Sequence, residues 1–143
     1  AEGVIVVAVN RHNELLLIRE YAAGFHEIQL TLPKGLVEPQ ESMEAAASRE
    51  LAEEVGFAAN RTELVKRLTL APSHMGFSIN VVFATDLYPH QLQGDEPEPI
   101  ELVPWPLQRL DELLHNEEFC EARAIAALAL CRPLFSQLLE ATD

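Results

Sequence analysis

The chain has 143 residues and a formal net charge of −13, from 10 Lys and Arg against 23 Asp and Glu. Its apolar fraction of 48% and charged fraction of 23% are those of an ordinary globular protein with a proper core. A charge of this sign repels phosphate backbones and anionic lipid headgroups, which argues against nucleic acid and membranes as partners. We expect one domain over residues 1–143.

The two cysteines and the first apolar segment indicate in which cellular compartment the protein is expected. Cys120 and Cys131 lie eleven residues apart and form neither a disulfide framework nor a zinc motif, so we expect reduced thiols and a cytoplasmic protein. The apolar run at residues 4–9 is too short to cross a bilayer, and no basic residues precede it.

The secondary structure follows from apolar patterning and from turn residues. Residues 4–9 and 15–19, joined by a turn at residues 10–13, predict a hairpin whose first strand is buried on both faces. A helix is expected over residues 42–55, with Ser42 as N-cap and Gly56 just past its end. The other expected elements are strands at 28–32, 63–70, 79–87 and 100–103, an exposed loop at 88–99, and helices at 107–114 and 121–139, the last bent or interrupted at Pro133. This order predicts an α/β fold with a mixed β-sheet sandwiched between α-helices.

The helix at residues 42–55 carries an unusual set of carboxylates. Glu50 and Glu54 project beside its apolar stripe, about 40° apart, and Glu53 lies one step round. Carboxylates at the margin of a buried face repel one another and lose hydration unless cations neutralise them. Hard divalent cations such as Mg²⁺ take such oxygen ligands. The alternative is a solvated acidic helix face, which is common in acidic proteins.

The spacing around this helix favours the metal. Gly35 is followed after five residues by Glu41 and, after seven more, by the run RELAEEVGF at residues 49–57. A chance match to nine such specified positions is rarer than roughly one in a million. The pattern resembles the Nudix box, G-x5-E-x7-R-E-U-x-E-E-x-G-U with U apolar, at every fixed position.

This resemblance implies a Nudix fold and hydrolysis of a nucleoside diphosphate linked to another moiety, with Mg²⁺ or Mn²⁺. By position, Glu50 and Glu54 are the expected principal metal ligands and Glu53 a further ligand. The backbone carbonyl near Gly35 would complete the metal site, and Arg49 would orient the carboxylates. Bound cations would also explain how so acidic a protein holds an anionic substrate.

Features outside the box narrow the substrate class. Pro72 lies sixteen residues after Gly56, a spacing that marks ADP-ribose pyrophosphatases in this superfamily. Stretches such as LLLIREYAAG (15–24) and KGLVEPQES (34–42) resemble bacterial ADP-compounds hydrolases over most of the chain. The resemblance implies a small-molecule ADP-linked substrate such as ADP-ribose, NADH or a diadenosine polyphosphate, with AMP as one product. It also implies a homodimer. Related enzymes usually have an additional N-terminal strand region that is exchanged between subunits, and the sequence begins after it, so we expect either that this region is missing from the chain or that the nucleoside is recognised differently.

The sequence offers more than one candidate for the general base and for the substrate contacts. In related ADP-ribose pyrophosphatases a glutamate from a later loop activates water, and Glu98 is the better match to it, with Glu96 second and Glu53 the competing base. Arg19 and Ser73 are candidate substrate contacts, each with an ordinary surface role as the alternative. The rival functions are hydrolysis of another nucleoside diphosphate derivative, such as a nucleotide sugar, and a non-catalytic nucleotide-binding sensor.

Overall fold

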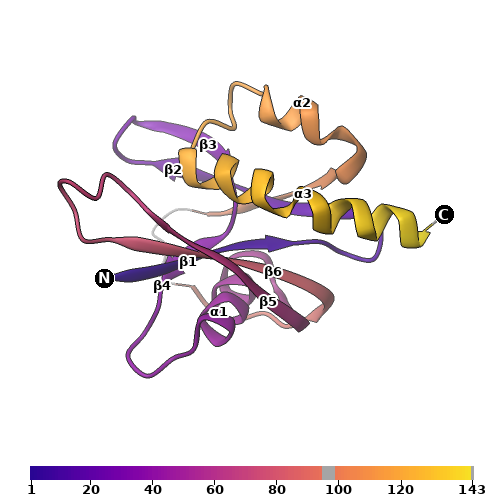
Figure 1. Ribbon diagram of the computed structural model, residues 1–143, viewed down its shortest axis with the longest axis horizontal. Coiled ribbons are helices and arrows are strands. Elements are labelled where there is room, and N and C mark those ends of the chain that lie inside the picture. Colours follow the sequence, from indigo (N-terminus) through magenta and orange to yellow (C-terminus); the bar gives the residue numbers. More distant parts are fainter. Residues whose placement is uncertain (95–98, 143) are drawn as a thin grey trace.

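The fold comes from a computed structural model that describes residues 1–94 and 99–142. Two sheets lie among three helices (Figure 1). The elements in chain order are β1 (Glu2–Ala8), β2 (Glu14–Ala22), β3 (Glu27–Thr31), β4 (Lys34–Leu36), α1 (Met43–Val55), β5 (Phe57–Thr69), β6 (Ser78–Pro89), β7 (Glu101–Pro106), a 3-10 turn η1 (Leu107–Arg109), α2 (Leu110–Leu114) and α3 (Ala122–Thr142).

One sheet is mixed and the other is antiparallel. The four-stranded sheet has the order β4-β1-β6-β5, in which β1 runs parallel to β6 and antiparallel to β4. The three-stranded sheet has the order β3-β2-β7, and all its pairs are antiparallel. These sheets with their helices confirm the expected α/β class and mixed sheet.

Strand β1 separates two hydrophobic cores because successive side chains point to opposite faces. Ile5 and Val7 lie in one core with Leu128 of α3, whereas Val4 and Val6 lie in the other with Leu51 of α1. Figure 1 accordingly shows α1 and α3 on opposite sides of the mixed sheet. The prediction that the first strand is buried on both faces is confirmed.

The predicted hairpin between the first two strands is wrong. The chain does turn at residues 10–13, but β1 and β2 then enter different sheets and share only the isolated bridge between Val9 and Leu15. A turn reverses the chain without choosing pairing partners. Those are set by which apolar faces can be buried, and both strands are apolar on both faces.

Other differences concern strand ends. β5 begins directly after α1 instead of at residue 63, β6 runs two residues into the expected loop, and the short β4 was not expected. β7 contains Pro104 and Pro106, which its edge position permits because one side of an edge strand needs no donors. The last helix continues through Pro133 without interruption.

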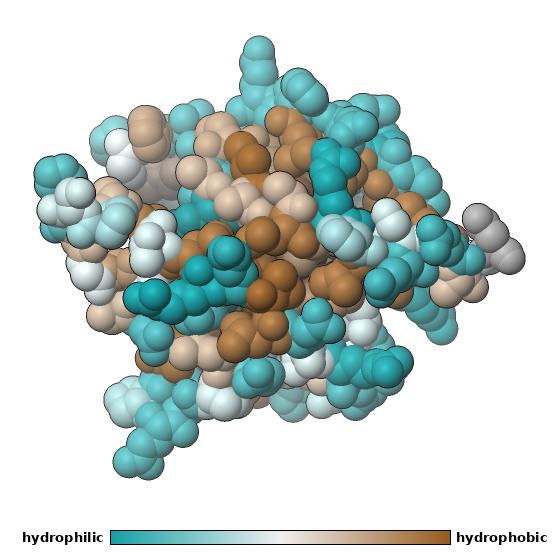
Figure 2. Space-filling view, viewed as in Figure 1, coloured by the Kyte–Doolittle hydropathy of each residue, from teal (hydrophilic) through white to brown (hydrophobic). Residues whose placement is uncertain are grey.

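Helix α3 is the one described helix whose length and composition would allow it to cross a membrane. A core helix of a globular protein has the same character, and α3 buries Ala127, Leu128 and Phe135 against the sheet. Further apolar side chains of α3 are only partly buried. Figure 2 shows apolar side chains gathered in the middle of this face, where α3 lies beside β5.

The two cysteines are expected to differ sharply in reactivity. Cys131 is fully buried on α3, and burial, together with the charge of Glu63, raises its pKa to about 12, while Cys120 is exposed. Only the thiolate reacts with alkylating agents. Iodoacetamide at pH 8 should therefore modify one thiol of the folded protein and both thiols in guanidinium, as counted by intact mass. Rapid double labelling of the folded protein would contradict the burial of Cys131.

Candidate active site on helix α1

The sequence sets both ends of α1. The Ser42 hydroxyl accepts a hydrogen bond from the Ala45 N–H at 3.0 Å, as an N-cap should. Gly56 has φ 78°, the left-handed conformation that ends a helix and favours glycine. Both predictions for the ends of this helix are confirmed.

The acidic side chains of α1 lie at the margin of its buried face, as the helical wheel predicts. Glu50 and Glu54 are 7% and 8% exposed, and the side chain of Glu53 is 17% exposed. The Glu54 Oε2 atom accepts a hydrogen bond from the Lys34 main-chain N–H at 3.0 Å. This hydrogen bond connects helix α1 to the start of β4. Because Glu50 and Glu54 are buried, the alternative of a solvated acidic helix face does not hold for them.

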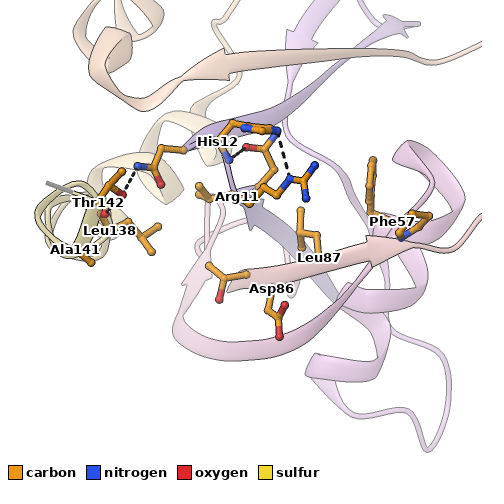
Figure 3. A pocket seen from close by; sticks show the side chains of 13 residues that line it. Arg11, His12, Phe57, Asp86, Leu87, Leu138, Ala141 and Thr142 are labelled. Atoms are coloured by element: carbon orange, nitrogen blue, oxygen red, sulfur yellow. Dashed lines mark hydrogen bonds between the residues drawn. The ribbon is translucent and has the colours of Figure 1, made fainter.

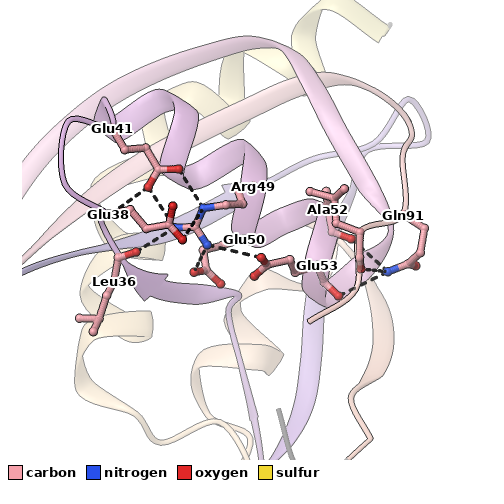
Figure 4. A network of polar contacts seen from close by, with 9 residues as sticks. Leu36, Glu38, Glu41, Arg49, Glu50, Ala52, Glu53 and Gln91 are labelled. Carbon is pink, nitrogen blue, oxygen red and sulfur yellow. Dashed lines mark hydrogen bonds and ion pairs between the residues drawn. The ribbon is translucent and has the colours of Figure 1, made fainter. Parts of the chain in front are cut away.

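Arg49 lies at the centre of this carboxylate cluster (Figure 4). Its Nε donates to Glu41 Oε2 at 2.8 Å, and its Nη1 donates to Glu50 Oε1 at 2.9 Å. The same Nη1 lies 3.5 Å from Glu53 Oε1, and Nη2 donates to the Leu36 carbonyl at 3.0 Å. One guanidinium thus bridges α1, the loop before it and β4, which is the geometry needed to orient the carboxylates.

The ion pairs shift the pKa values of both partners. Hydrogen bonding from Arg49 lowers the pKa of Glu41, and the Glu38 main-chain N–H acts in the same direction. Hydrogen bonding to Glu41 and Glu50 raises the pKa of Arg49. These contacts favour the ionised form of Glu41, which holds the arginine in place.

Gly35 leaves the space that the Glu50 carboxylate occupies. A Cβ at position 35 would lie 2.1 Å from Glu50 Oε1, far inside van der Waals contact. Replacing Gly35 by alanine should therefore displace Glu50 and weaken Mg²⁺ binding about 10- to 100-fold, as disturbance of ligand orientation does elsewhere. Isothermal titration with Mg²⁺ measures this effect.

Gly24 provides the matched control for that substitution. A Cβ at position 24 would meet nothing within 4 Å, so the alanine variant at this position should bind Mg²⁺ as the parent does. Equal affinities for all three proteins would show that Glu50 does not take part in binding the metal.

The donor set suits a hard divalent cation. Glu50, Glu53 and Glu54 carry carboxylate oxygens, and a backbone carbonyl near Gly35 is the predicted further donor. Within residues 1–94 and 99–142, no three His, Cys, Asp or Glu side chains already converge as a metal cluster. Arg49 instead faces Glu50 and Glu53 as their cation.

The other predicted substrate contacts lie on different elements. Arg19 on β2 pairs with Glu101 at 3.1 Å and Glu118 at 3.2 Å, and hydrogen bonding to Glu118 raises its pKa. Ser73 is exposed in the connection between β5 and β6. Glu96 and Glu98 lie outside the described residues.

The segment that leads toward those two glutamates is attached to α1. The Gln91 side chain donates to the Ala52 carbonyl at 3.1 Å, and the Leu92 N–H donates to the same carbonyl at 3.2 Å. The His90 N–H donates to the Gly56 carbonyl at 3.0 Å. Sequence patterns did not single out Gln91, because an exposed amide in a polar stretch resembles any loop residue.

A cavity of about 770 Å³ lies away from the box glutamates, between the turn after β1, the end of β6 and the end of α3 (Figure 3). Phe57, Leu87 and Leu138 contribute apolar walls, and Asp86 contributes a carboxylate. None of the box glutamates lines it. The candidate metal ligands on α1 therefore lie outside this cavity.

Comparison with known proteins decides the family. The Nudix domain model matches residues 1–128. The chain belongs to the Nudix family. Over 131 residues it is 50% identical to the ADP compounds hydrolase NudE of Escherichia coli (strain K12), a match that covers 92% of this chain and 70% of that protein.

Two further matches agree with this assignment. Over 128 residues the chain is 24% identical to the ADP-ribose pyrophosphatase of Bacillus subtilis (strain 168), covering 88% of this chain and 69% of the relative. A crystal structure of an ADP compounds hydrolase has a TM-score of 0.91 and 46% identity, over 95% of this chain and 73% of the other. The predicted Nudix fold is confirmed, whereas the roles of single residues stay predictions.

Proposed function

We propose that this Nudix protein is an enzyme that hydrolyses the diphosphate linkage of ADP-linked compounds and releases AMP. Its 50% identity to an ADP compounds hydrolase supports this substrate class. The observation that carries the proposal is the assembly of the whole Nudix box in space: Glu50 lies against Gly35, and Arg49 bridges Glu41 to Glu50.

Residues of α1 and β4 together bind a divalent cation, with Mg²⁺ preferred and Mn²⁺ accepted. Glu50 and Glu54 act as principal ligands, with Glu53 and the carbonyl near Gly35 completing the set. Arg49 keeps Glu50 and Glu53 oriented. A divalent cation held by these residues would neutralise the diphosphate and would lower the pKa of water for attack on phosphorus.

Release of AMP from ADP-ribose and NADH tests the proposal. We expect AMP from either substrate with Mg²⁺ and none with EDTA. Nucleotide sugars and non-canonical nucleotides belong in the same panel, because preferential turnover of one of them would assign a different Nudix activity. Saturable ADP-ribose binding without turnover in Mg²⁺ or Mn²⁺ would indicate a nucleotide sensor.

The general base is expected on the acidic segment at residues 95–99. Replacing Glu98 by glutamine removes a proton acceptor and no metal ligand, so kcat should fall about 100-fold or more while Mg²⁺ affinity stays nearly unchanged. Glu96→Gln and Glu53→Gln are the comparison variants. A normal rate for Glu98→Gln with a reduced rate for either of the others would move the role to that residue.

We also propose a cytoplasmic homodimer. Tyr21, Phe25 and Ile28, on or beside the β2–β3 hairpin, are 42%, 75% and 51% exposed, an apolar patch that a second subunit would cover. Light scattering coupled to size exclusion reports the mass directly. A monomer at micromolar concentration would contradict the dimer.

A further inference from the structure

A second, smaller cavity lies beside the box carboxylates. It has a volume of about 210 Å³, and we call it the ion-pair cavity. Its polar lining comes from β2, β3, β4 and the segment that enters α3: Glu20, Gln29, Thr31, Lys34, Glu121 and Arg123. Pockets for whole drug-sized ligands are larger, so this one suits a single ring-sized group.

The ion-pair cavity adjoins the proposed metal site through one residue. Lys34 contributes to its wall, and the main-chain N–H of Lys34 donates to Glu54 Oε2 at 3.0 Å. The next residue, Gly35, lies against the carboxylate of Glu50. A diphosphate held at α1 would therefore place one of its two substituents at the cavity.

The charges in the cavity cancel in pairs. Lys34 Nζ lies 2.6 Å from Glu20 Oε1, and Arg123 Nε lies 3.0 Å from Glu121 Oε1. A phosphate entering here would meet two carboxylates as well as two cations. A neutral polyol gains from both, because its hydroxyls donate to carboxylates and accept from ammonium and guanidinium groups.

Thr31 adds an unsatisfied hydroxyl to this lining. The residue is 2% exposed, and its Oγ1 atom has no hydrogen-bond partner in the part of the chain that the structure describes. Buried hydroxyls normally have partners, and a ligand hydroxyl that reaches Oγ1 from the cavity would supply one. A sugar hydroxyl can both donate to Oγ1 and accept from it.

We infer that the ion-pair cavity binds the hydroxyl-bearing sugar joined through the diphosphate to the nucleoside, and that Thr31 and Glu121 determine specificity for it. This inference rests on the proposed function. It explains why two partly buried ion pairs and an unsatisfied hydroxyl gather beside the proposed metal site. It also predicts that the sugar, and not only the ADP moiety, contributes to substrate choice.

The first experiment compares two substrates that share ADP. ADP-ribose carries the sugar, whereas the ethyl ester of ADP does not. Thr31→Val keeps the side-chain shape, and Glu121→Gln keeps the size. Each should lower kcat/KM for ADP-ribose about fivefold to tenfold, mainly through KM, and leave the ethyl ester unchanged.

Thr69→Val is the matched control, because Thr69 is exposed on β5 and does not line the ion-pair cavity. It should change neither substrate. Equal losses on both substrates in Thr31→Val and Glu121→Gln, or no loss at all, would overturn the inference. Gln29→Ala, two residues before Thr31 on β3 and in the lining of the same cavity, gives the same test if one of these variants does not fold.

The second experiment needs no turnover. Ribose 5-phosphate titrated into the ¹⁵N-labelled wild-type protein should shift the amide signals of Thr31, Lys34 and Arg123, and inorganic phosphate at equal concentration should not. Identical shifts with phosphate, or none with ribose 5-phosphate, would overturn the sugar site. A wild-type enzyme that cleaves no ADP-linked compound would overturn the proposed function alone, because this titration reports the cavity independently.

Discussion

Replacing Glu54 by glutamine should abolish Mg²⁺-dependent turnover while the fold remains intact. Glu54 is 8% exposed, and its Oε2 accepts from the Lys34 N–H, a hydrogen bond that a glutamine Oε1 can still accept. The variant loses only the negative charge that a divalent cation needs. Mutation of a residue that only positions a metal ligand lowers metal affinity or activity by up to roughly 100-fold, and loss of a direct ligand should lower them further.

AMP release and Mg²⁺ titration measure this effect, and thermal unfolding in EDTA checks the fold. Glu117→Gln is the control, because Glu117 is exposed between α2 and α3 and makes the same chemical change. Normal activity in Glu54→Gln would remove Glu54 from the proposed metal site. A large fall in the unfolding temperature of the metal-free protein would show that its charge serves structure instead.

Replacing Arg49 by glutamine should destabilise the metal-free protein more than removal of an exposed ion-pair partner does. The guanidinium contacts Glu41, Glu50 and Glu53, and these carboxylates are mostly buried. Removing one partner of a fully buried ion pair costs about 3–5 kcal/mol, and we expect about 2 kcal/mol here because Arg49 is partly exposed. Urea unfolding in EDTA gives the free energy of unfolding directly.

Mg²⁺ should restore part of the stability that Arg49→Gln loses. A cation bound at α1 neutralises the same carboxylates, and binding to the folded state alone raises its stability. Arg109→Gln is the control: Arg109 pairs with Glu112 at 2.6 Å, but both side chains are more than half exposed, so its removal should cost under about 1 kcal/mol. Equal losses in the two variants would contradict a central role for Arg49.

Local signals in the sequence predicted helix α1 well, because its caps and its periodicity are encoded within fifteen residues. Ser42, Gly56 and the apolar stripe through Leu51 act as expected. Strand pairing was predicted poorly. The choice of β6 and β4 as neighbours of β1 depends on surfaces far away in the chain, and a run that is apolar on both faces fits several partners.

The same distinction holds for the site. The carboxylates on α1 could be predicted because their spacing forms a motif. Glu20 and Lys34, which pair at 2.6 Å, could not, because the contact joins β2 to β4. The alternation of side chains along β2 gives a partial signal for this contact. Arg19 and Glu20 point to opposite faces of the sheet, so only one of them can face Lys34.

The position of β1 between β4 and β6 has a consequence for the order in which the protein folds. β5 and β6 are neighbours in the chain, joined by residues 70–77, and can pair early, whereas β1 pairs with β6 across about half of the chain, from Glu2 to Ser78. Gly35 on β4 reaches its place beside Glu50 only when β1 has entered the sheet. We therefore expect the proposed metal site on α1 to be completed late in folding, after β1 has joined the sheet.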